Sequence, residues 1–347
     1  MTEDNKVIVG LDAMGGDLAP AETVNAAIWA VHDDEDVIVK LYGDEARVNA
    51  ELKKYKYDTD RIEVVHCASV IENCDQPTRA IRSKRDSSMV MGLYGVKHGE
   101  ADAFVSCGNT GALLVGGQLI VGRLPGIERP ALAFIVPSAK GPVMIIDCGA
   151  NVDTKPKVLV QFAQMATVYM QTIVGIENPR VGIVNIGEEE EKGNALVQET
   201  IPLLKSCEGI NYAGSIESRG ITEGVVDIVV CDAFVGNVIL KMYEGVAKML
   251  LKEIKGVLMT NMKTKIGAAL IKSDLKKTLK TFSIEEYGGA PMLGLKSLVA
   301  KTHGNSKAVE IRNTILQCKT FVQNDVTGRI ADKISGMTID QAEKTEE

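Results

Sequence analysis

The sequence predicts an α/β fold in which helices cover both faces of a mostly parallel sheet. Short apolar runs rich in β-branched residues alternate with longer segments of helical spacing, and the runs are continuous rather than alternating in polarity. Composition agrees, because 45% of the 347 residues are apolar and 24% are charged, as in ordinary globular proteins. A chain of this length buries enough surface to fold without disulfides or a structural metal.

Seven apolar runs predict strands, which in chain order are Val7–Leu11, Val37–Leu41, Ile62–Val65, Ala103–Val105, Val143–Ile146, Val181–Val184 and Ile228–Val230. Residues 137–142, PSAKGP, are typical of a turn. Because this turn separates Ala131–Val136 from Val143–Ile146, we expect one antiparallel hairpin within an otherwise parallel sheet.

Helices are predicted by start signals and by apolar spacing. Pro20 begins a helix beside the first glycine-rich loop. Farther along, two successive stretches follow helical spacing, the first through Val246, Met249, Leu250, Ile254 and Val257 and the second through Ile266, Leu270 and Leu279. We therefore expect a helical hairpin over about 244–282 that projects from a single domain of residues 1–337, followed by a polar tail at 338–347.

Charge is unevenly distributed along the chain. The net charge is −7, yet the segment from Lys248 to Lys280 holds nine lysines against Glu253 and Asp274, so it carries +7 and the remainder −14. A basic island on an acidic protein indicates a local acidic partner. Aromatic residues make up only 4% of the chain, too few for nucleic-acid stacking platforms, and no nucleic-acid partner is expected.

Cysteine usage and the N-terminus indicate a cytoplasmic protein. The seven cysteines form no CxxC pair, and MTEDNK lacks the basic and apolar regions of a signal peptide. The longest uncharged apolar run, residues 111–122, is shorter than the roughly 18 residues that span a bilayer. The protein could still lie peripherally on a membrane surface.

Five glycine-bearing loops with Asp or Asn follow predicted strands: DAMGGD at 12–17, SCGNTGA at 106–112, DCGAN at 147–151, NIGEEEEKG at 185–193 and CDAFVGN at 231–237. In a parallel sheet these carboxyl ends would share one edge, where ligands bind. Glycines let backbone N–H groups approach an anion, and helix N-termini add positive potential. The loops together predict a phosphate or small-anion site, although any one of them could be only a turn with a helix cap.

Other phosphate and catalytic motifs do not account for these loops. GxxxxGKS, GxxxxGKT, GxGxxG, HExxH and GxSxG are all absent, which argues against a P-loop ATPase, a standard dinucleotide-binding fold, a zincin-type metal site and a nucleophile elbow. Cys107 could be a thiol nucleophile, but no base is identifiable beside it in sequence, and a small buried residue explains it as well.

The loops carry a family resemblance. DAMGGD at 12–17, SCGNTGAL at 106–113, GIERPAL at 126–132, DCGANVD at 147–153, NPRVGIVNIGEEEEKGN at 178–194, CDAFVGNVILK at 231–241 and YGGAPMLGLKSLVAKTHGN at 287–305 resemble the bacterial acyl-acyl-carrier-protein:phosphate acyltransferases. Ala233 stands where that family usually has Gly. The resemblance implies a Rossmann-like three-layer α/β/α fold related to phosphotransacetylases and isocitrate-type dehydrogenases. It also implies a homodimer, no metal, nucleotide or other cofactor, and a link to the membrane glycerol-3-phosphate acyltransferase that consumes acyl phosphate.

Site residues follow from the loops and the resemblance. Lys192 resembles the family's catalytic lysine, although alone it reads as a surface residue. Asn237 could donate to phosphate or an oxyanion, or could cap a helix, and His303 could protonate the leaving thiolate or be an ordinary turn residue. Glu188 and Glu189 could orient Lys192 or could simply favour a helix N-terminus. The remaining predicted substrate-binding residues are polar and glycine positions of the loops: Asp12, Gly15, Gly16, Asn109, Thr110, Gly111, Asp147, Asn151, Glu188, Glu189 and Asp232.

Two basic patches could dock the acidic acyl carrier protein. The first patch is Arg79, Arg82, Lys84 and Arg85, and the second is Lys272, Lys276, Lys277 and Lys280 on the hairpin. The hairpin's apolar stripe could be dimer core, membrane contact or part of an acyl groove, and dimer packing is favoured. Rival functions are a phosphotransacetylase using acyl-coenzyme A, a decarboxylating dehydrogenase and a membrane-recruited scaffold.

Overall fold

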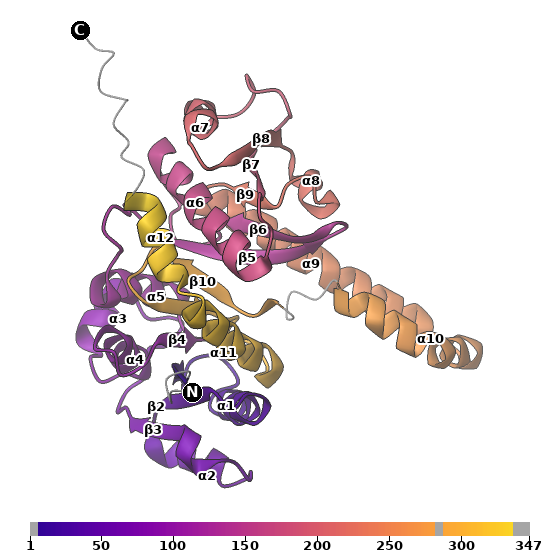
Figure 1. Ribbon diagram of the computed structural model, residues 1–347. Helices are drawn as coiled ribbons and strands as arrows, with labels where there is room; N and C mark the ends of the chain where they lie inside the picture. Colours follow the sequence, from indigo (N-terminus) through magenta and orange to yellow (C-terminus); the bar gives the residue numbers. More distant parts are fainter. Residues whose placement is uncertain (1–5, 282–286, 336–347) are drawn as a thin grey trace.

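The computed structural model describes residues 6–281 and 287–335, which build one continuous sheet flanked by helices (Figure 1). Its strands are β1 (Val7–Asp12), β2 (Val37–Gly43), β3 (Ile62–His66), β4 (Ala103–Ser106), β5 (Ala131–Ser138), β6 (Gly141–Ile146), β7 (Arg180–Val184), β8 (Asn211–Ile216), β9 (Ile228–Val230), β10 (Ala290–Leu293) and β11 (Leu298–Lys301). Their order across the sheet is β3-β2-β1-β4-β11-β10-β5-β6-β9-β7-β8. All seven predicted strands are confirmed, whereas β8, β10 and β11 were not predicted.

The sheet is mostly parallel but contains three antiparallel strand pairs. The predicted hairpin is confirmed as β5 and β6, which pair from Ala133 with Ile146 to Ser138 with Gly141. The expectation of a single antiparallel pair is wrong, because β10 is antiparallel to both β11 and β5. A short connection from Leu293 to Leu298 turns the chain back from β10 into β11.

Helices cover both faces of the sheet, which confirms the three-layer α/β/α prediction. They are α1 (Ala21–Asp33), α2 (Glu45–Leu52), α3 (Pro77–Ser83), α4 (Ser88–Lys97), α5 (Thr110–Gly116), α6 (Pro156–Tyr169), α7 (Ala195–Ser206), α8 (Ser218–Glu223), α9 (Ala233–Leu258), α10 (Met262–Thr281), α11 (Ala308–Gln323) and α12 (Val326–Ser335). Short 3₁₀ and π segments occupy Thr59–Arg61, Gly117–Val121 and Met170–Val174.

Side-chain alternation along the strands sends neighbouring residues into different cores. On β4, Val105 packs into a core shared with α1, α6 and α11, whereas Phe104 packs against α4 and α5 on the other face. On β6, Ile146 joins the first core and Ile145 joins a third core under α8 and α9. This period of two is what a sheet buried on both faces requires.

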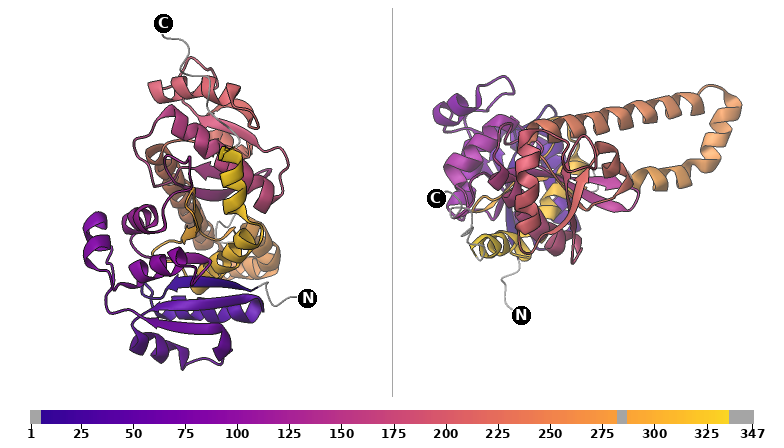
Figure 2. Two further views of the ribbon diagram at one scale, coloured as in Figure 1. Left: turned by 60° about the vertical axis from the view of Figure 1, so that its left-hand side comes forward. Right: turned by 90° about the horizontal axis from the view of Figure 1, so that it is seen from above.

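Helices α9 and α10 form an arm that projects from the sheet (Figures 1 and 2). The predicted hairpin is confirmed, but its first helix begins at Ala233 rather than near 244, because Asp232 caps it by accepting the Val235 N–H at 2.9 Å. At 1.5 Å per residue α9 is about 39 Å long. The expected tail at 338–347 lies outside the described residues.

The arm exposes large apolar side chains, among them Met249, Leu250, Ile266, Leu270 and Ile271. Exposed fractions reach 80% at Leu270. Among the helices described, none combines the length and the apolar character that crossing a bilayer requires. The stripe therefore lies on a surface helix pair.

Candidate functional site

The loops after β1 and β4 interlock around the buried carboxylate of Asp12. Its Oδ2 atom accepts a hydrogen bond from the Ser106 hydroxyl at 2.7 Å, and the Gly108 N–H donates to the same hydroxyl at 3.0 Å. Burial raises the pKa of Asp12, while hydrogen bonds from Ser88 and Ser106 oppose that shift. Asp12 thus fixes the backbone of the two glycine-bearing loops.

Gly15 and Gly16 allow a third loop to join this group. A Cβ on Gly15 would lie 2.4 Å from Asp12 Oδ2, and one on Gly16, whose φ is +96°, would lie 2.8 Å from the Gly304 carbonyl oxygen. The Asp17 N–H donates to that carbonyl at 2.7 Å. The loops after β1, β4 and β11 therefore meet at one edge of the sheet.

Asn109 uses its side chain to hold the backbone. Its Oδ1 accepts the Ala112 N–H at 2.9 Å, which caps α5. Its Nδ2 lies 3.1 to 3.2 Å from three carbonyl oxygens of an earlier loop, those of Glu72, Asn73 and Asp75. Thr110 is exposed beside it, and a Cβ on Gly111 would meet Pro77 at 2.6 Å. The Asn109 amide is therefore used to hold the backbone of two loops together. The exposed Thr110 hydroxyl is the polar side-chain group of this loop that remains available to a ligand.

Asp147 fixes the backbone of the loop after β6, as Asp12 does for the loops after β1 and β4. Its carboxylate accepts five hydrogen bonds of 2.7 to 3.1 Å, from the N–H groups of Leu132, Gly149, Ala150 and Asn151 and from Asn151 Nδ2. Burial raises its pKa, and these donors oppose the shift. The Asn151 carbonyl accepts the Ala233 N–H at 2.9 Å, so the loop after β6 is tied to the start of α9.

Lys192 and Asn237 both lie at the surface. Lys192 Nζ is 2.9 Å from Glu189 Oε2, and the hydrogen bond and charge of Glu189 raise the pKa of this lysine. Glu188 is exposed and lines a depression with Glu190 rather than contacting Lys192. Asn237 is exposed in the second turn of α9, and the interpretation of Asn237 as a helix cap is wrong because Asp232 is the cap.

The prediction that all five loops share one edge is wrong. Between β4 and β6 the sheet contains three antiparallel steps, β11 to β10, β10 to β5 and β5 to β6, so β6, β9 and β7 run opposite to β1 and β4. Loops 12–17 and 106–112 therefore end at one edge of the sheet, and loops 147–151, 185–193 and 231–237 end at the other.

Helix α9 connects the two groups of loops. It starts beside Asp147, where a Cβ on Gly236 would lie 1.9 Å from the Asp147 carbonyl oxygen, and runs back across the sheet. Spacings of four, three and four residues place Asn237, Lys241, Glu244 and Lys248 on one face of α9. We call these four residues the polar face of α9.

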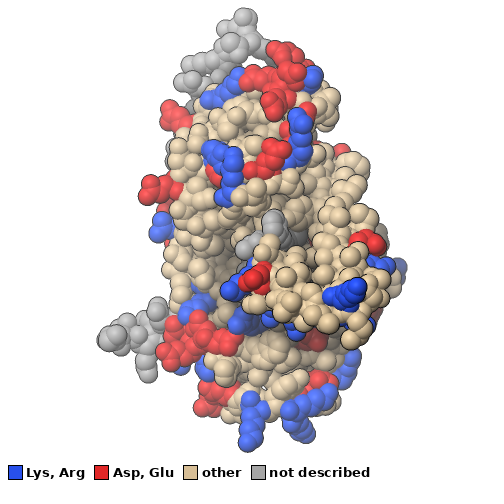
Figure 3. Space-filling view, turned by 90° about the vertical axis from the view of Figure 1, so that its right-hand side faces the viewer, with Lys and Arg blue, Asp and Glu red and all other residues tan. Residues whose placement is uncertain are grey.

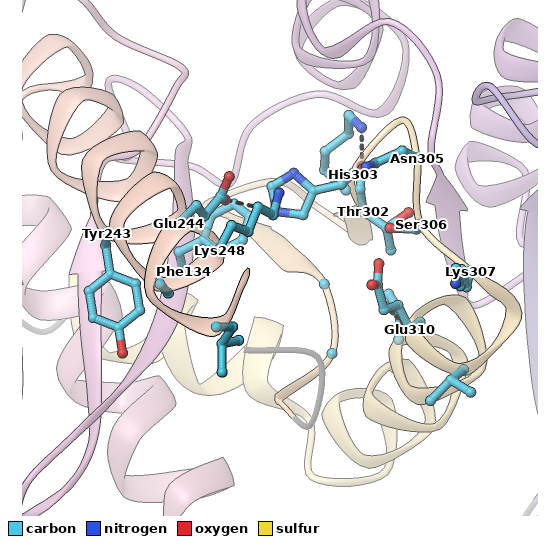
Figure 4. Close-up of a pocket in the computed structure, with 17 residues that line it drawn as sticks. Phe134, Tyr243, Glu244, Lys248, Thr302, His303, Asn305, Ser306, Lys307 and Glu310 are labelled. Carbon is cyan, nitrogen blue, oxygen red and sulfur yellow. Dashed lines mark hydrogen bonds and ion pairs between the residues drawn. The ribbon is translucent and has the colours of Figure 1, made fainter. Parts of the chain in front are cut away.

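The polar face of α9 reaches a cavity of about 470 Å³ between α9, the loop after β11 and the start of α11 (Figure 4). The cavity contains His303 but none of Asn109, Asn151, Lys192 and Asn237. Its lining is Phe134, Tyr243, Glu244, Ala247, Lys248, Leu251, Gly288, Gly289, Lys301, Thr302, His303, Asn305, Ser306, Lys307, Val309, Glu310 and Thr314.

His303 is held by α9 and is not a free turn residue. Its Nε2 lies 3.1 Å from Glu244 Oε1 (Figure 4). On the other side of the carboxylate, Lys241 Nζ lies 3.1 Å from Glu244 Oε2. Burial raises the pKa of Glu244, but the hydrogen bond from His303 and the charges of His303 and Lys241 outweigh burial and leave it at about 2. A carboxylate that stays ionised can orient His303 for proton transfer.

Lys301 is a cavity residue that sequence reasoning missed. Its side chain is 6% exposed, and Nζ donates to the carbonyl oxygen of Cys107 at 3.3 Å and to that of Thr302. Burial lowers the pKa of Lys301 to about 8. Burial also raises the pKa of Cys107 to about 11, so its thiol stays protonated and is a poor nucleophile.

Comparison with known proteins identifies the family. The chain matches the family described as "Fatty acid synthesis protein" over residues 7–329. It is 43% identical over 336 residues to a protein of Clostridium perfringens named phosphate acyltransferase, covering 97% of this chain and 99% of the relative. The chain belongs to the phosphate acyltransferase family. A family member from Alkaliphilus oremlandii is 46% identical over 334 residues, covering 96% of this chain and 99% of that protein.

The fold of this phosphate acyltransferase family member is shared with phosphotransacetylases. Structures from Staphylococcus aureus and Streptococcus pyogenes match with TM-scores of 0.57 and 0.59, each at 16% sequence identity. The first covers 92% of this chain and 94% of its own, the second 93% and 95%. The predicted relation of folds and the predicted transferase family are both confirmed.

The first basic patch of this phosphate acyltransferase family member is only partly available. Arg79, Arg82 and Arg85 are exposed, and the first two line a depression of about 360 Å³. Lys84 is engaged, because its Nζ lies 2.6 Å from Asp75 Oδ2 and 2.8 Å from the Val70 carbonyl oxygen.

The second basic patch lies on the arm. Lys272, Lys276 and Lys277 are exposed on α10, and the side chain of Lys280 lies outside the described residues. Viewed toward its tip, the arm is largely uncharged, with charged side chains, most of them lysines, at its margin (Figure 3). The arm therefore combines an apolar stripe with a basic border.

Proposed function

We propose that this protein transfers a long-chain fatty acyl group from acyl carrier protein to inorganic phosphate and releases acyl phosphate. The observation that carries this proposal is the two-sided character of α9. Beside its polar face, α9 lines an apolar groove of about 820 Å³ with Val238, Met242, Val246, Leu250 and Ile254.

The groove and the lysine-bearing cavity share a wall, since Tyr243, Ala247 and Leu251 line both. A reaction that joins an acyl chain to a phosphate needs an apolar site next to a cationic one. The relatives named phosphate acyltransferase support the same reaction.

In this proposal a phosphate oxygen attacks the thioester carbonyl, a C–O bond forms, and the C–S bond breaks as the thiolate of the phosphopantetheine arm leaves. Phosphate is already partly dianionic at neutral pH, so it requires positioning more than deprotonation. Asn237, on the face of α9 that leads to His303, would stabilise the developing negative charge, and His303, oriented by Glu244, would give the thiolate its proton. Lys192 follows β7 at the other edge of the sheet, and its proposed catalytic role rests on its resemblance to the family's lysine. The Thr110 hydroxyl and the loop backbones would add hydrogen bonds to phosphate.

The test is to incubate the protein with palmitoyl acyl carrier protein and phosphate and to trap acyl phosphate with hydroxylamine. Palmitoyl-coenzyme A and acetyl-coenzyme A serve as alternative donors. Hydroxamate that depends on phosphate and forms fastest from the carrier-protein donor supports the proposal. Equal or faster turnover of acetyl-coenzyme A would make the protein a phosphotransacetylase instead.

Carrier-protein docking is expected to use one of the two basic patches, since the donor protein is acidic. If the arm docks it, reversing charge with Lys276→Glu and Lys277→Glu should raise the KM for acyl carrier protein by about tenfold while kcat stays within about twofold. Arg79→Glu with Arg82→Glu is the matched variant for the other patch. An unchanged KM combined with lost binding to anionic vesicles would assign the arm to the membrane, where the acyltransferase that consumes acyl phosphate would meet it.

The apolar stripe of the arm is proposed to pack in a homodimer. Leu270, 80% exposed, should be covered there, so Leu270→Asp should shift the protein toward monomer in sedimentation velocity. Ser273→Asp, at an exposed position between Lys272 and Asp274, is the control and should leave the oligomeric state unchanged. A dimer that persists in Leu270→Asp would contradict packing through this stripe.

A further inference from the structure

The cavity beside α9 holds a buried cation that is paired with no carboxylate among the described residues. Lys301 Nζ contacts only the Cys107 and Thr302 carbonyl oxygens within hydrogen-bond distance there, and no described carboxylate lies within 4.0 Å of it. Burying an ammonium group without a counter-ion is unfavourable, so such a lysine is either neutral or complemented by a bound anion.

A second, independent group in the same cavity also lacks a partner. Ser306 is 3% exposed, and its Oγ has no hydrogen-bond partner among the described residues. Buried hydroxyls are ordinarily satisfied, so an open one on a cavity wall indicates a ligand that completes it. Lys301 is the last residue of β11 and Ser306 lies two residues before α11, so the two residues flank one short loop.

The rest of the lining favours an anion. Lys248 and Lys307 stand at the cavity with Lys301, against the carboxylates of Glu244 and Glu310. Glu244 is ion-paired with His303 and Lys241, although its Oε1, like Ser306 Oγ, has no well-aligned hydrogen-bond partner among the described residues. The start of α11 adds no open donor at Ala308, because the Ala308 N–H already donates to Glu22 Oε2 at 2.6 Å, so the anion preference rests on the lysines.

We propose that Lys301 and Ser306 form the binding site for a phosphate group in this cavity. The assignment rests on the proposed function, because both inorganic phosphate and the phosphopantetheine arm of the donor carry such a group. A phosphate oxygen would accept from Lys301 Nζ and from Ser306 Oγ, and the neighbouring apolar groove would receive the acyl chain.

The test measures phosphate binding without any acyl donor. In calorimetric titrations of the full chain with inorganic phosphate, and separately with 4′-phosphopantetheine, Lys301→Met should weaken the Kd by about 10- to 100-fold. Ser306→Ala should weaken it less, by roughly three- to tenfold. Lys140→Met, at an exposed lysine of the β5–β6 turn, is the control and should leave both constants unchanged.

Thermal unfolding separates a binding role from a structural one. Because methionine removes a buried charge and keeps the packing, Lys301→Met without ligand should unfold at the same Tm as the parent or higher, and phosphate should no longer raise it. If the Tm of Lys301→Met falls below that of the parent and the phosphate Kd of Ser306→Ala equals that of the parent, the loop has a structural role and the assignment is overturned.

The two probes and the activity assay give distinguishable outcomes. Weakened binding of inorganic phosphate assigns the acceptor substrate to the cavity, and weakened binding of 4′-phosphopantetheine alone assigns the donor arm. Unchanged affinity for both in Lys301→Met and Ser306→Ala overturns the site, even if the protein still makes acyl phosphate. Lys301-dependent binding in a protein that forms no acyl phosphate would retain the site and reject the proposed function.

Discussion

Replacing Lys192 with alanine should lower kcat for acyl phosphate formation by about 10²- to 10³-fold, the usual effect of removing a group that stabilises transition-state charge. The fold should be unaffected, because the side chain is half exposed and its only ion pair in the described part of the chain is with the equally exposed Glu189. The measurement is steady-state turnover by hydroxamate trapping, together with the Tm of each variant.

Lys205 provides a matched control for Lys192. It is also 50% exposed, and its Nζ lies 2.6 Å from Glu190 in the neighbouring segment, so Lys205→Ala removes a similar surface charge from the same acidic run. We expect its kcat to stay within about twofold of the parent, as for other surface substitutions. Near-normal turnover in Lys192→Ala, or an equal loss in both variants, would refute a chemical role for Lys192.

Gly236→Ala should be among the most destabilising single substitutions in the chain. The new Cβ would lie 1.9 Å from the Asp147 carbonyl oxygen and 3.0 Å from Cys231 Sγ, and a backbone atom cannot move aside as a flexible side chain can. We expect a loss of about 3 kcal/mol or more in the free energy of unfolding. Urea unfolding followed by circular dichroism measures it.

Gly245 is the control on the same helix. Nothing lies within 4 Å of the position that its Cβ would occupy, so Gly245→Ala should gain up to about 1 kcal/mol from helix propensity. The contrast isolates the close approach of α9 to the loop after β6. Similar effects of the two substitutions would mean that α9 does not depend on that approach.

Local patterns were enough to predict the strands of both halves and the β5–β6 hairpin, because each is an apolar run bounded by turn residues. They missed β8, whose residues mix polar and apolar types, and they missed β10 and β11. The last two are only four residues each and are strands because they fill the gap between β4 and β5. The direction of the second half depends on the pairing of Met292 with Leu132 and of Ala290 with Lys301, contacts between segments far apart in sequence. No local pattern encodes that reversal, which is why the single shared edge was wrongly predicted.

The loop residues were correctly singled out as special, but their chemistry could not be read from type alone. Asp147 and Asn109 direct their polar atoms at backbone groups, a use that residue identity does not distinguish from ligand binding. Lys301 was overlooked because a lysine at the end of an apolar run usually marks the point where a strand reaches solvent. Its burial is visible only once β11 is seen lying between β4 and β10.

The position of β11 in the middle of the sheet has a consequence for biosynthesis. Residues 298–301 pair directly with β4, made nearly 200 residues earlier, and their immediate neighbour β10 carries the link to β5. A nascent chain that still lacks these residues has two half-sheets. Each half-sheet has an unpaired edge strand, β4 in one and β5 in the other, and unpaired edge strands are prone to aggregation. Closure of the sheet therefore has to wait until β10 and β11 have been synthesised, after both halves.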